Sequence, residues 1–153
     1  MIAALLAAAA LTGNAGTCSA SELSARPHDS SGAAGTIAVS ITLTNRGPAC
    51  TLRGYAGLQL RNAGGPLPTT VVHGGLAFLK KTPKLVHLAY GGKATLLIAY
   101  NDVPSGSGSC RKATRLLIRP PGASAGISLG LTLLACRGRI YEAPILAGVR
   151  SAG

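Results

Sequence analysis

Four cysteines constrain this chain more than any other feature, because their spacing decides whether they bind a metal or cross-link a fold. They lie far apart, at positions 18, 50, 110 and 136. Structural zinc sites usually place cysteines about two to four residues apart, and this chain has no C-x-x-C pair. An even number of dispersed cysteines is typical of two disulfides in an exported protein. We therefore expect no metal site and no cofactor.

The segments that flank the last two cysteines predict how those cysteines pair. Residues 113–120 and 127–134 both alternate in the period of two that β-strands show. If residues 120–126 turn the chain, paired positions sum to about 246, and Cys110 faces Cys136. The two strands could instead lie in different sheets, since the connection has seven residues.

Cys18 and Cys50 then pair by elimination, which ties the N-terminal segment to the end of a strand predicted at 36–44. Each of the two cross-links, Cys18–Cys50 and Cys110–Cys136, is expected to contribute about 3.5 kcal/mol through the chain entropy of the unfolded state. Neither disulfide is expected to be catalytic.

The rest of the sequence predicts short strands joined by turns. Glycine (21 residues) and proline (9 residues) are abundant, and charged residues make up 12% of the chain. The clearest strand, at 36–44, carries Ile37, Val39, Ile41 and Leu43 on one face and small polar residues on the other. About seven or eight strands of this kind favour an all-β fold, an antiparallel β-sandwich of immunoglobulin-like type. The polar residues 19–35 are interpreted as an extended arm held by Cys18.

Residues 1–17 are interpreted as a signal peptide, and residues 18–153 as a single domain. The apolar run at 1–11 is shorter than the roughly 20 residues that cross a bilayer, and small residues follow it. No Lys or Arg precedes Arg26, so we hypothesise that the leader begins upstream of Met1. Lipoprotein anchoring at Cys18 is an alternative. We favour a paired Cys18, because lipidation would leave three cysteines.

The chain is strongly basic, with a formal net charge of +11. Such a surface attracts anionic polymers and phospholipid headgroups. Specific nucleic-acid binding is not expected, because stacking platforms need aromatic side chains, which make up only 3% of the chain. The candidate contacts for an anionic envelope polymer or a membrane surface are Lys80, Lys81, Lys84 and Lys93.

Several motifs in order resemble domain-of-unknown-function family 4232, a family of exported domains common in actinobacteria. The resemblance rests on an N-terminal cysteine, a Leu-x-Asn strand end, a Cys-x-Leu-x-Gly-Tyr turn and an Asn-x-x-Gly hairpin. These residues are Cys18, Leu43, Asn45, Cys50, Leu52, Gly54, Tyr55, Asn62 and Gly65. Downstream, HLAYGGKATL, CRKATRLLIRPPG and LACRG are similar to further family motifs. The resemblance implies a disulfide-linked β-sandwich at or outside the cell envelope, and it supplies no site.

No catalytic pattern is evident, and we expect no enzymatic activity. Asp102 and Glu142 lack a carboxylate partner, and neither G-x-S-x-G nor H-E-x-x-H is present. His87 is interpreted as a packed or rim histidine, and Tyr55 as a buried side chain that locks a turn.

The sequence thus favours an exported, non-enzymatic domain of the cell envelope with a binding or structural role. The alternative is a small secreted hydrolase or inhibitor whose site lies on loops. A deep pocket that holds His73 or His87 beside Asp102 would support this alternative.

Overall fold

In the computed structural model, residues 15–104, 106 and 108–153 are described, and they form two main sheets and a short two-stranded ladder. The first sheet has the order β1-β2-β8-β11-β6, and β12 also pairs with β8. Its strands are β1 (Leu23–Ala33), β2 (Thr36–Asn45), β6 (Thr70–His73), β8 (Lys93–Asn101), β11 (Arg139–Glu142) and β12 (Leu146–Ala147). The second sheet has the order β10-β9-β4-β5 and contains β4 (Gly57–Asn62), β5 (Gly65–Pro66), β9 (Cys110–Arg119) and β10 (Ile127–Cys136).

The smaller elements connect these sheets. Strand β3 (Cys50–Leu52) pairs with β7 (Val86–Leu88), and two short 3-10 helices are present, η1 (Ala20–Glu22) and η2 (Ala77–Leu79). Among the described residues, no helix is long and apolar enough to cross a membrane. Residues 1–14 of the predicted signal peptide lie outside the described residues.

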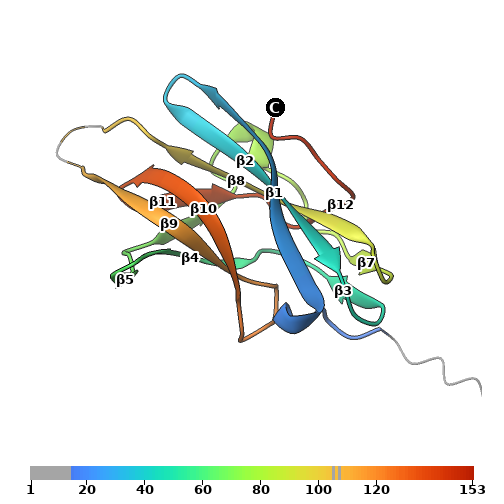
Figure 1. The fold of residues 1–153 in the computed structure, drawn as a ribbon. Helices are drawn as coiled ribbons and strands as arrows, with labels where there is room; N and C mark the ends of the chain where they lie inside the picture. The colour runs from blue at the N-terminus through green and yellow to red at the C-terminus, as the bar shows by residue number, and fades with distance from the viewer. Residues whose placement is uncertain (1–14, 105, 107) are drawn as a thin grey trace, which may run out of the picture.

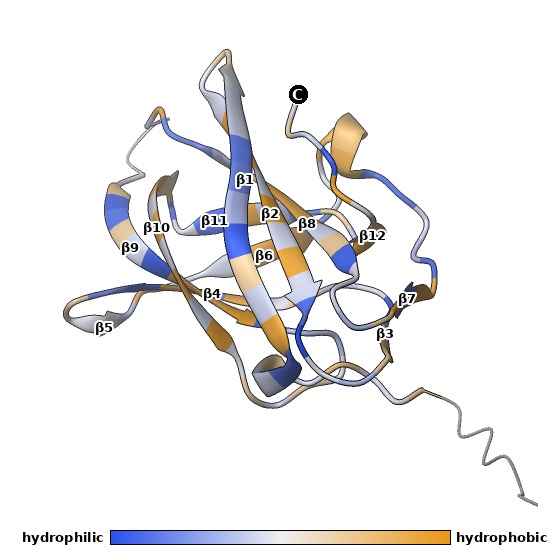
Figure 2. Cartoon of the chain, turned by 45° about the vertical axis from the view of Figure 1, so that its right-hand side comes forward, coloured by the Kyte–Doolittle hydropathy of each residue, from blue (hydrophilic) through white to orange (hydrophobic). Residues whose placement is uncertain are grey.

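The two main sheets stack face to face and enclose the core of a β-sandwich (Figure 1). Leu43 and Leu96 of the first sheet and Leu60, Leu116 and Leu133 of the second are almost fully buried in one apolar cluster. Strands β2 and β8 carry apolar segments, whereas much of β1 is hydrophilic (Figure 2). The all-β class, the sandwich and both predicted disulfides are therefore confirmed.

The strand order is that of an immunoglobulin-like domain. Strands β1, β2 and β8 occupy the positions of A, B and E, and β4, β9 and β10 occupy those of C, F and G. The position of strand D, next to E, is taken by β11, which comes from the C-terminal end of the domain. Strand β6 then joins β11 in parallel, so the first sheet is mixed rather than purely antiparallel as expected. Eight strands of the described chain have four or more residues, in agreement with the predicted number.

The β9–β10 pair confirms the predicted register at one end and departs from it at the other. Cys136 faces Cys110 and Leu133 faces Ala113, as a sum of 246 requires. Beyond a register shift between Gly130 and Leu133, the sum falls to 245, and Ile127 faces Ile118. At this register shift β10 has two residues, Leu131 and Thr132, where β9 has one, Thr114, so the extra residue belongs to β10.

Residues 19–35 were interpreted as an extended arm held by Cys18, and the pairing of this segment in the first sheet was not expected. Residues 23–33 form β1, which pairs with β2 from Leu23–Asn45 to Ala33–Thr36. Because β1 is an edge strand, its outer side chains lie in solvent, and the ladder requires only its backbone groups. Because its residues are mostly polar, this strand of 11 residues shows no apolar alternation from which it could be predicted.

Strand β2 is buried on both faces, although its alternating pattern predicted burial on one. Val39, Ile41 and Leu43 point into the sandwich core as expected. On the opposite face, Ala38 and Ser40 are covered by residues 150–153 and by the region of η2. In Figure 1 the C-terminal segment returns along the outer side of the first sheet, next to η2. The outer face of this sheet thus has a second, smaller layer of packing.

Candidate functional site

The lysine-rich segment that follows η2 lines a groove on the surface. Lys80, Lys81 and Lys84 are exposed, and together they line a groove of about 470 Å³. The same groove is lined by Leu146 of β12 and by Arg150. We call it the cationic groove. It brings together three of the four lysines that the sequence singled out.

Lys93 lies outside the lining of this groove. It begins β8, and its Nζ donates a hydrogen bond to Thr44 Oγ1 at 3.2 Å. The structure therefore separates Lys93 from the three lysines of the cationic groove.

Arg150 completes the cationic groove and was missed by the sequence analysis. Its backbone N–H donates to Thr95 Oγ1 at 3.0 Å, and its Nε donates to the Ala147 carbonyl at 2.9 Å. Its carbonyl oxygen accepts a hydrogen bond from the Ser40 hydroxyl. These contacts fix the backbone of Arg150 against β2 and β8.

A second groove adjoins the first and shares Lys81, Leu146 and Arg150 with it. This groove measures about 560 Å³, and we call it the apolar groove. Its other lining residues come from β1, β2, η2, β8 and the C-terminal segment: Ser31, Ala33, Thr36, Ala38, Phe78, Leu97, Ser151, Ala152 and Gly153.

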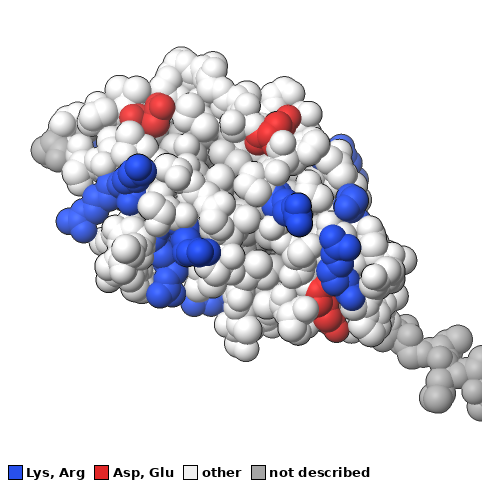
Figure 3. Space-filling model, viewed as in Figure 1, with Lys and Arg blue, Asp and Glu red and all other residues white. Residues whose placement is uncertain are grey.

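The described residues that line the two grooves include cations and no Asp or Glu side chain, and the backbone of Gly153 at the C-terminus lines the apolar groove. The nearest acidic group in the hydrogen-bond network is Asp29, whose Oδ1 accepts from the Ala152 N–H at 2.8 Å. On the face seen in Figure 3, basic side chains form separate groups and acidic side chains lie among them. Positive charge is thus spread over this face. Arginines also line two smaller hollows, two in each, and the cationic groove differs from these by the convergence of four cations.

A different cluster lies where β6 pairs with β11. Glu142 is fully buried, and its Oε1 lies 3.2 Å from Nε2 of His73, a side chain that is 55% exposed. The His73 ring stacks on the half-buried ring of Tyr55, with centroids 3.8 Å apart and an interplanar angle of 1°. The Gly74 N–H donates to the Glu142 carbonyl at 2.8 Å, which holds the two strands in register.

Burial raises the pKa of Glu142 from 4.5 to about 8. The backbone N–H of Ala56 opposes this increase, but it does not reach good hydrogen-bond geometry with either carboxyl oxygen. Apart from the ion-pair contact with His73, neither Glu142 oxygen has a hydrogen-bond partner in the described part of the chain. The carboxyl is therefore mostly protonated at neutral pH.

The histidines and Asp102 do not form the arrangement that would have favoured a hydrolase. Asp102 lies near Tyr100, where burial first and this carboxylate second raise the pKa of the phenol. His73 lies beside Glu142 instead, and no described serine or threonine hydroxyl is hydrogen-bonded to it. His87 is exposed between the buried Val86 and Leu88, so of the two alternatives, a packed or a rim histidine, the packed one is excluded. The described residues also contain no group of three His, Cys, Asp or Glu side chains suited to a metal ion.

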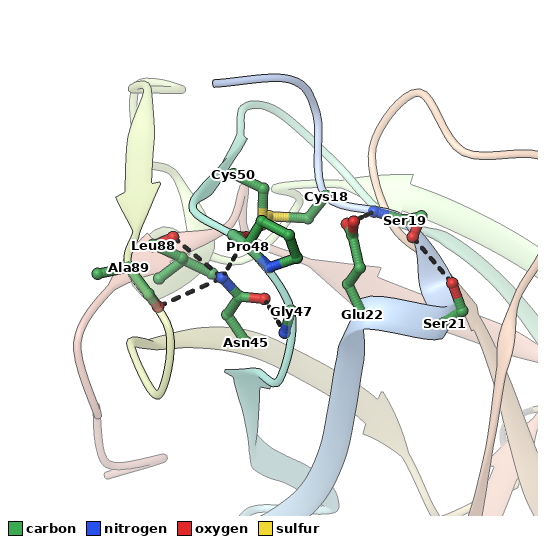
Figure 4. Close-up of a disulfide and its surroundings, with 10 residues drawn as sticks. All are labelled: Cys18, Ser19, Ser21, Glu22, Asn45, Gly47, Pro48, Cys50, Leu88 and Ala89. Atoms are coloured by element: carbon green, nitrogen blue, oxygen red, sulfur yellow. Dashed lines mark hydrogen bonds between the residues drawn. A yellow bond between two sulfur atoms is a disulfide. The ribbon is translucent and has the colours of Figure 1, made fainter. Parts of the chain in front are cut away.

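The Cys18–Cys50 disulfide belongs to a rigid corner built around Asn45 (Figure 4). The buried Asn45 amide donates to the carbonyls of Pro48 at 2.9 Å, Leu88 at 3.1 Å and Ala89 at 3.3 Å. Its Oδ1 accepts from the Gly47 N–H at 2.9 Å. One side chain thus ties the turn before Cys50 to the end of β7. The disulfide also uses the Cys18 sulfur that lipoprotein anchoring would require.

The protein is a β-sandwich domain of two stacked sheets, cross-linked by two disulfides. Its surface carries a groove lined by cations. The chain belongs to the family described as Domain of unknown function (DUF4232), whose model matches residues 18–143. The resemblance carried by the cysteine, Asn45 and Gly54–Tyr55 motifs is thereby confirmed. Searches of curated proteins and of solved structures gave no significant match.

Proposed function

We propose that this protein is an exported, non-enzymatic domain that associates with the cell envelope by binding an anionic polymer in the cationic groove. The observation that carries the proposal is the convergence of Lys80, Lys81, Lys84 and Arg150 around one concave surface. Unpaired cations on a concave surface raise the local concentration of anions, and a flexible polyanion can contact several of them at once. The two disulfides are compatible with export.

The test is a binding titration of the full chain, with its disulfides oxidised, against fluorescently labelled poly(glycerol phosphate). Affinity should fall steeply as the salt concentration rises, because exposed charges are screened over a Debye length of about 8 Å at physiological ionic strength. The triple variant Lys80→Gln, Lys81→Gln, Lys84→Gln should lose about tenfold or more in affinity at low salt.

The chain offers a matched control on the other sheet. Arg111, Lys112 and Arg115 are exposed, lie on β9 and occupy the same five-residue spacing as the groove lysines. Replacing all three with glutamine removes the same charge and should change the affinity by less than about threefold. Equal losses in the two triple variants would show that net charge, and not the groove, governs binding. Affinity that is insensitive to salt would also contradict the proposal.

A further inference from the structure

The apolar groove has a floor of small and aliphatic side chains on the outer face of the first sheet. Ala38 of β2 and Leu97 of β8 form this floor, and both belong to the second apolar cluster. Their neighbours in that cluster, Ala99 and Ala143, are also small. Because small residues leave room above the sheet, the C-terminal segment and η2 cover this face without filling the groove.

Phe78 leaves apolar surface exposed at the side of this groove. It is the only phenylalanine of the chain, it lies in η2, and it is 40% exposed. Leu85 and Val149, on the two segments that flank the cationic groove, are also exposed large hydrophobic residues. Figure 2 shows the hydrophobic turn of η2 near the C-terminal end of the chain. Of these three residues, Phe78 gives the apolar groove exposed apolar surface, and Leu85 lines the cationic groove.

The apolar groove is bordered by cations where it meets the cationic groove. Lys81 and Arg150 line both grooves. Its other polar lining groups are hydroxyls and the backbone, including the C-terminal Gly153. Of the hydroxyls, Ser31 Oγ already donates to the Ala152 carbonyl at 3.2 Å. A ligand that fits this lining has an apolar body and an anionic end.

We propose that the apolar groove binds a single-chain anionic amphiphile, with its alkyl chain over Ala38 and Leu97 and its anionic head between Lys81 and Arg150. A long-chain carboxylate is the simplest ligand of this class. The volume of about 560 Å³ lies within the usual range of small-molecule sites, about 300–1,000 Å³. This site goes beyond the proposed function, because a hydrophilic polymer would use the lysines and would leave the apolar floor unoccupied.

Isothermal titration of the full chain with sodium octanoate, decanoate and dodecanoate, each as a monomer, tests this proposal. Affinity should rise by up to about fourfold for each added methylene until the groove is filled. Decyltrimethylammonium, which has a similar chain and a cationic head, should bind at least about tenfold more weakly than decanoate, because Lys81 and Arg150 repel its head. Equal affinity for the two heads, or no dependence on chain length, would overturn the proposal.

Three variants locate the site. Ala38→Leu fills the floor and should weaken dodecanoate binding at least about tenfold. Phe78→Ala removes an exposed side wall, so it should weaken binding without disturbing the fold. Arg150→Gln should remove most of the preference for the anionic head, and Lys112→Gln on β9 is the control of equal charge. Unchanged dodecanoate binding in both Ala38→Leu and Phe78→Ala would overturn the proposal.

Two further arms separate this site from other modes of binding. Lys80→Gln with Lys84→Gln, which line only the cationic groove, should weaken poly(glycerol phosphate) binding and leave dodecanoate binding nearly unchanged. The polymer measurement can therefore contradict the proposed function while the dodecanoate measurement still supports the amphiphile site, and the reverse is also possible. Phosphatidylglycerol vesicles provide the second arm. Binding to the vesicles but not to monomeric dodecanoate would mean that the surface docks on a bilayer, and the proposed single-chain site would be refuted.

Discussion

Replacing Glu142 by glutamine should remove most of the pH dependence of stability between pH 5 and pH 8. The raised pKa of about 8 means that the folded state retains a proton which the unfolded state releases near pH 4.5. The protonated carboxyl therefore contributes its full stabilisation below about pH 4.5, and this contribution is lost as the pH rises toward 8. The glutamine variant cannot ionise, so its stability should not follow this decline.

The magnitude follows from the difference between the two pKa values. A shift of about 3.5 units corresponds to at most about 5 kcal/mol, with a slope of about 1.4 kcal/mol per pH unit over this range. The contact between His73 Nε2 and Oε1, which lie 3.2 Å apart, favours the carboxylate and reduces the loss. We expect a measured difference of about 2–4 kcal/mol between pH 5 and pH 8, a large part of the stability of a domain of this size.

The assay is urea denaturation of the wild type and of Glu142→Gln at half-unit steps from pH 4.5 to pH 9, with both disulfides oxidised. Groups that do not contact Glu142 contribute equally to both proteins and cancel in the difference, whereas His73, which contacts Oε1, needs a variant of its own. The two free energies of unfolding should agree within about 1 kcal/mol at pH 5 and diverge above pH 6, with the variant more stable. His73→Gln is the second variant, and it should keep the pH dependence because Glu142 remains buried.

Parallel pH profiles of the wild type and Glu142→Gln would refute the reasoning, because burial of the carboxyl would then have no energetic consequence. The opposite pattern, in which His73→Gln abolishes the dependence and Glu142→Gln preserves it, would assign the titration to the imidazole and would equally contradict it.

Three further predictions concern stability. Replacing Cys110 and Cys136 by alanine should lower the free energy of unfolding by about 3.5 kcal/mol in urea denaturation, and an unchanged midpoint would contradict the chain-entropy argument. Asn45→Ala leaves three carbonyls without their donor and should cost about 2–4 kcal/mol, measured in the same way; a loss below about 1 kcal/mol would show that water replaces the amide. Gly138→Ala should lower the melting temperature, because Gly138 has φ +63° and an added Cβ would collide with a backbone carbonyl. Gly130→Ala, at an open position, is its control, and equal effects would argue against the collision.

The parts of the fold that could be predicted are those set by neighbouring residues. The Cys110–Cys136 pair was accessible because two adjacent strands and one turn determine its register. The register shift in β10 was not predicted, although Gly130, an isolated glycine inside a strand, stands next to the extra residue at Leu131–Thr132 and is the signal that could have indicated it. Strand β1 was missed because an edge strand needs no apolar pattern, and the β6–β11 pairing was missed because it joins distant segments.

The same distinction applies to the candidate sites. The lysines at 80–84 are visible as a run in the sequence, and the structure places them together because they share one exposed loop. Arg150 reaches that groove only because the C-terminal segment folds back over β2 and β8, which no local pattern indicates. Glu142 carried a usable signal, a single acidic residue between the apolar Ile140 and Ala143 in a strand, but its contact with His73 depends on the parallel ladder.

The position of β6 at the end of the first sheet has a consequence for how the molecule acquires its structure. Within the described chain, its ladder partner is β11, whose residues stand about 70 positions later in the sequence. Pairings this distant raise the contact order and slow folding. During ribosomal synthesis, residues 70–73 cannot pair with β11 until nearly the whole domain has emerged. We therefore expect the β6 amides to gain protection among the last in refolding followed by pulsed hydrogen exchange.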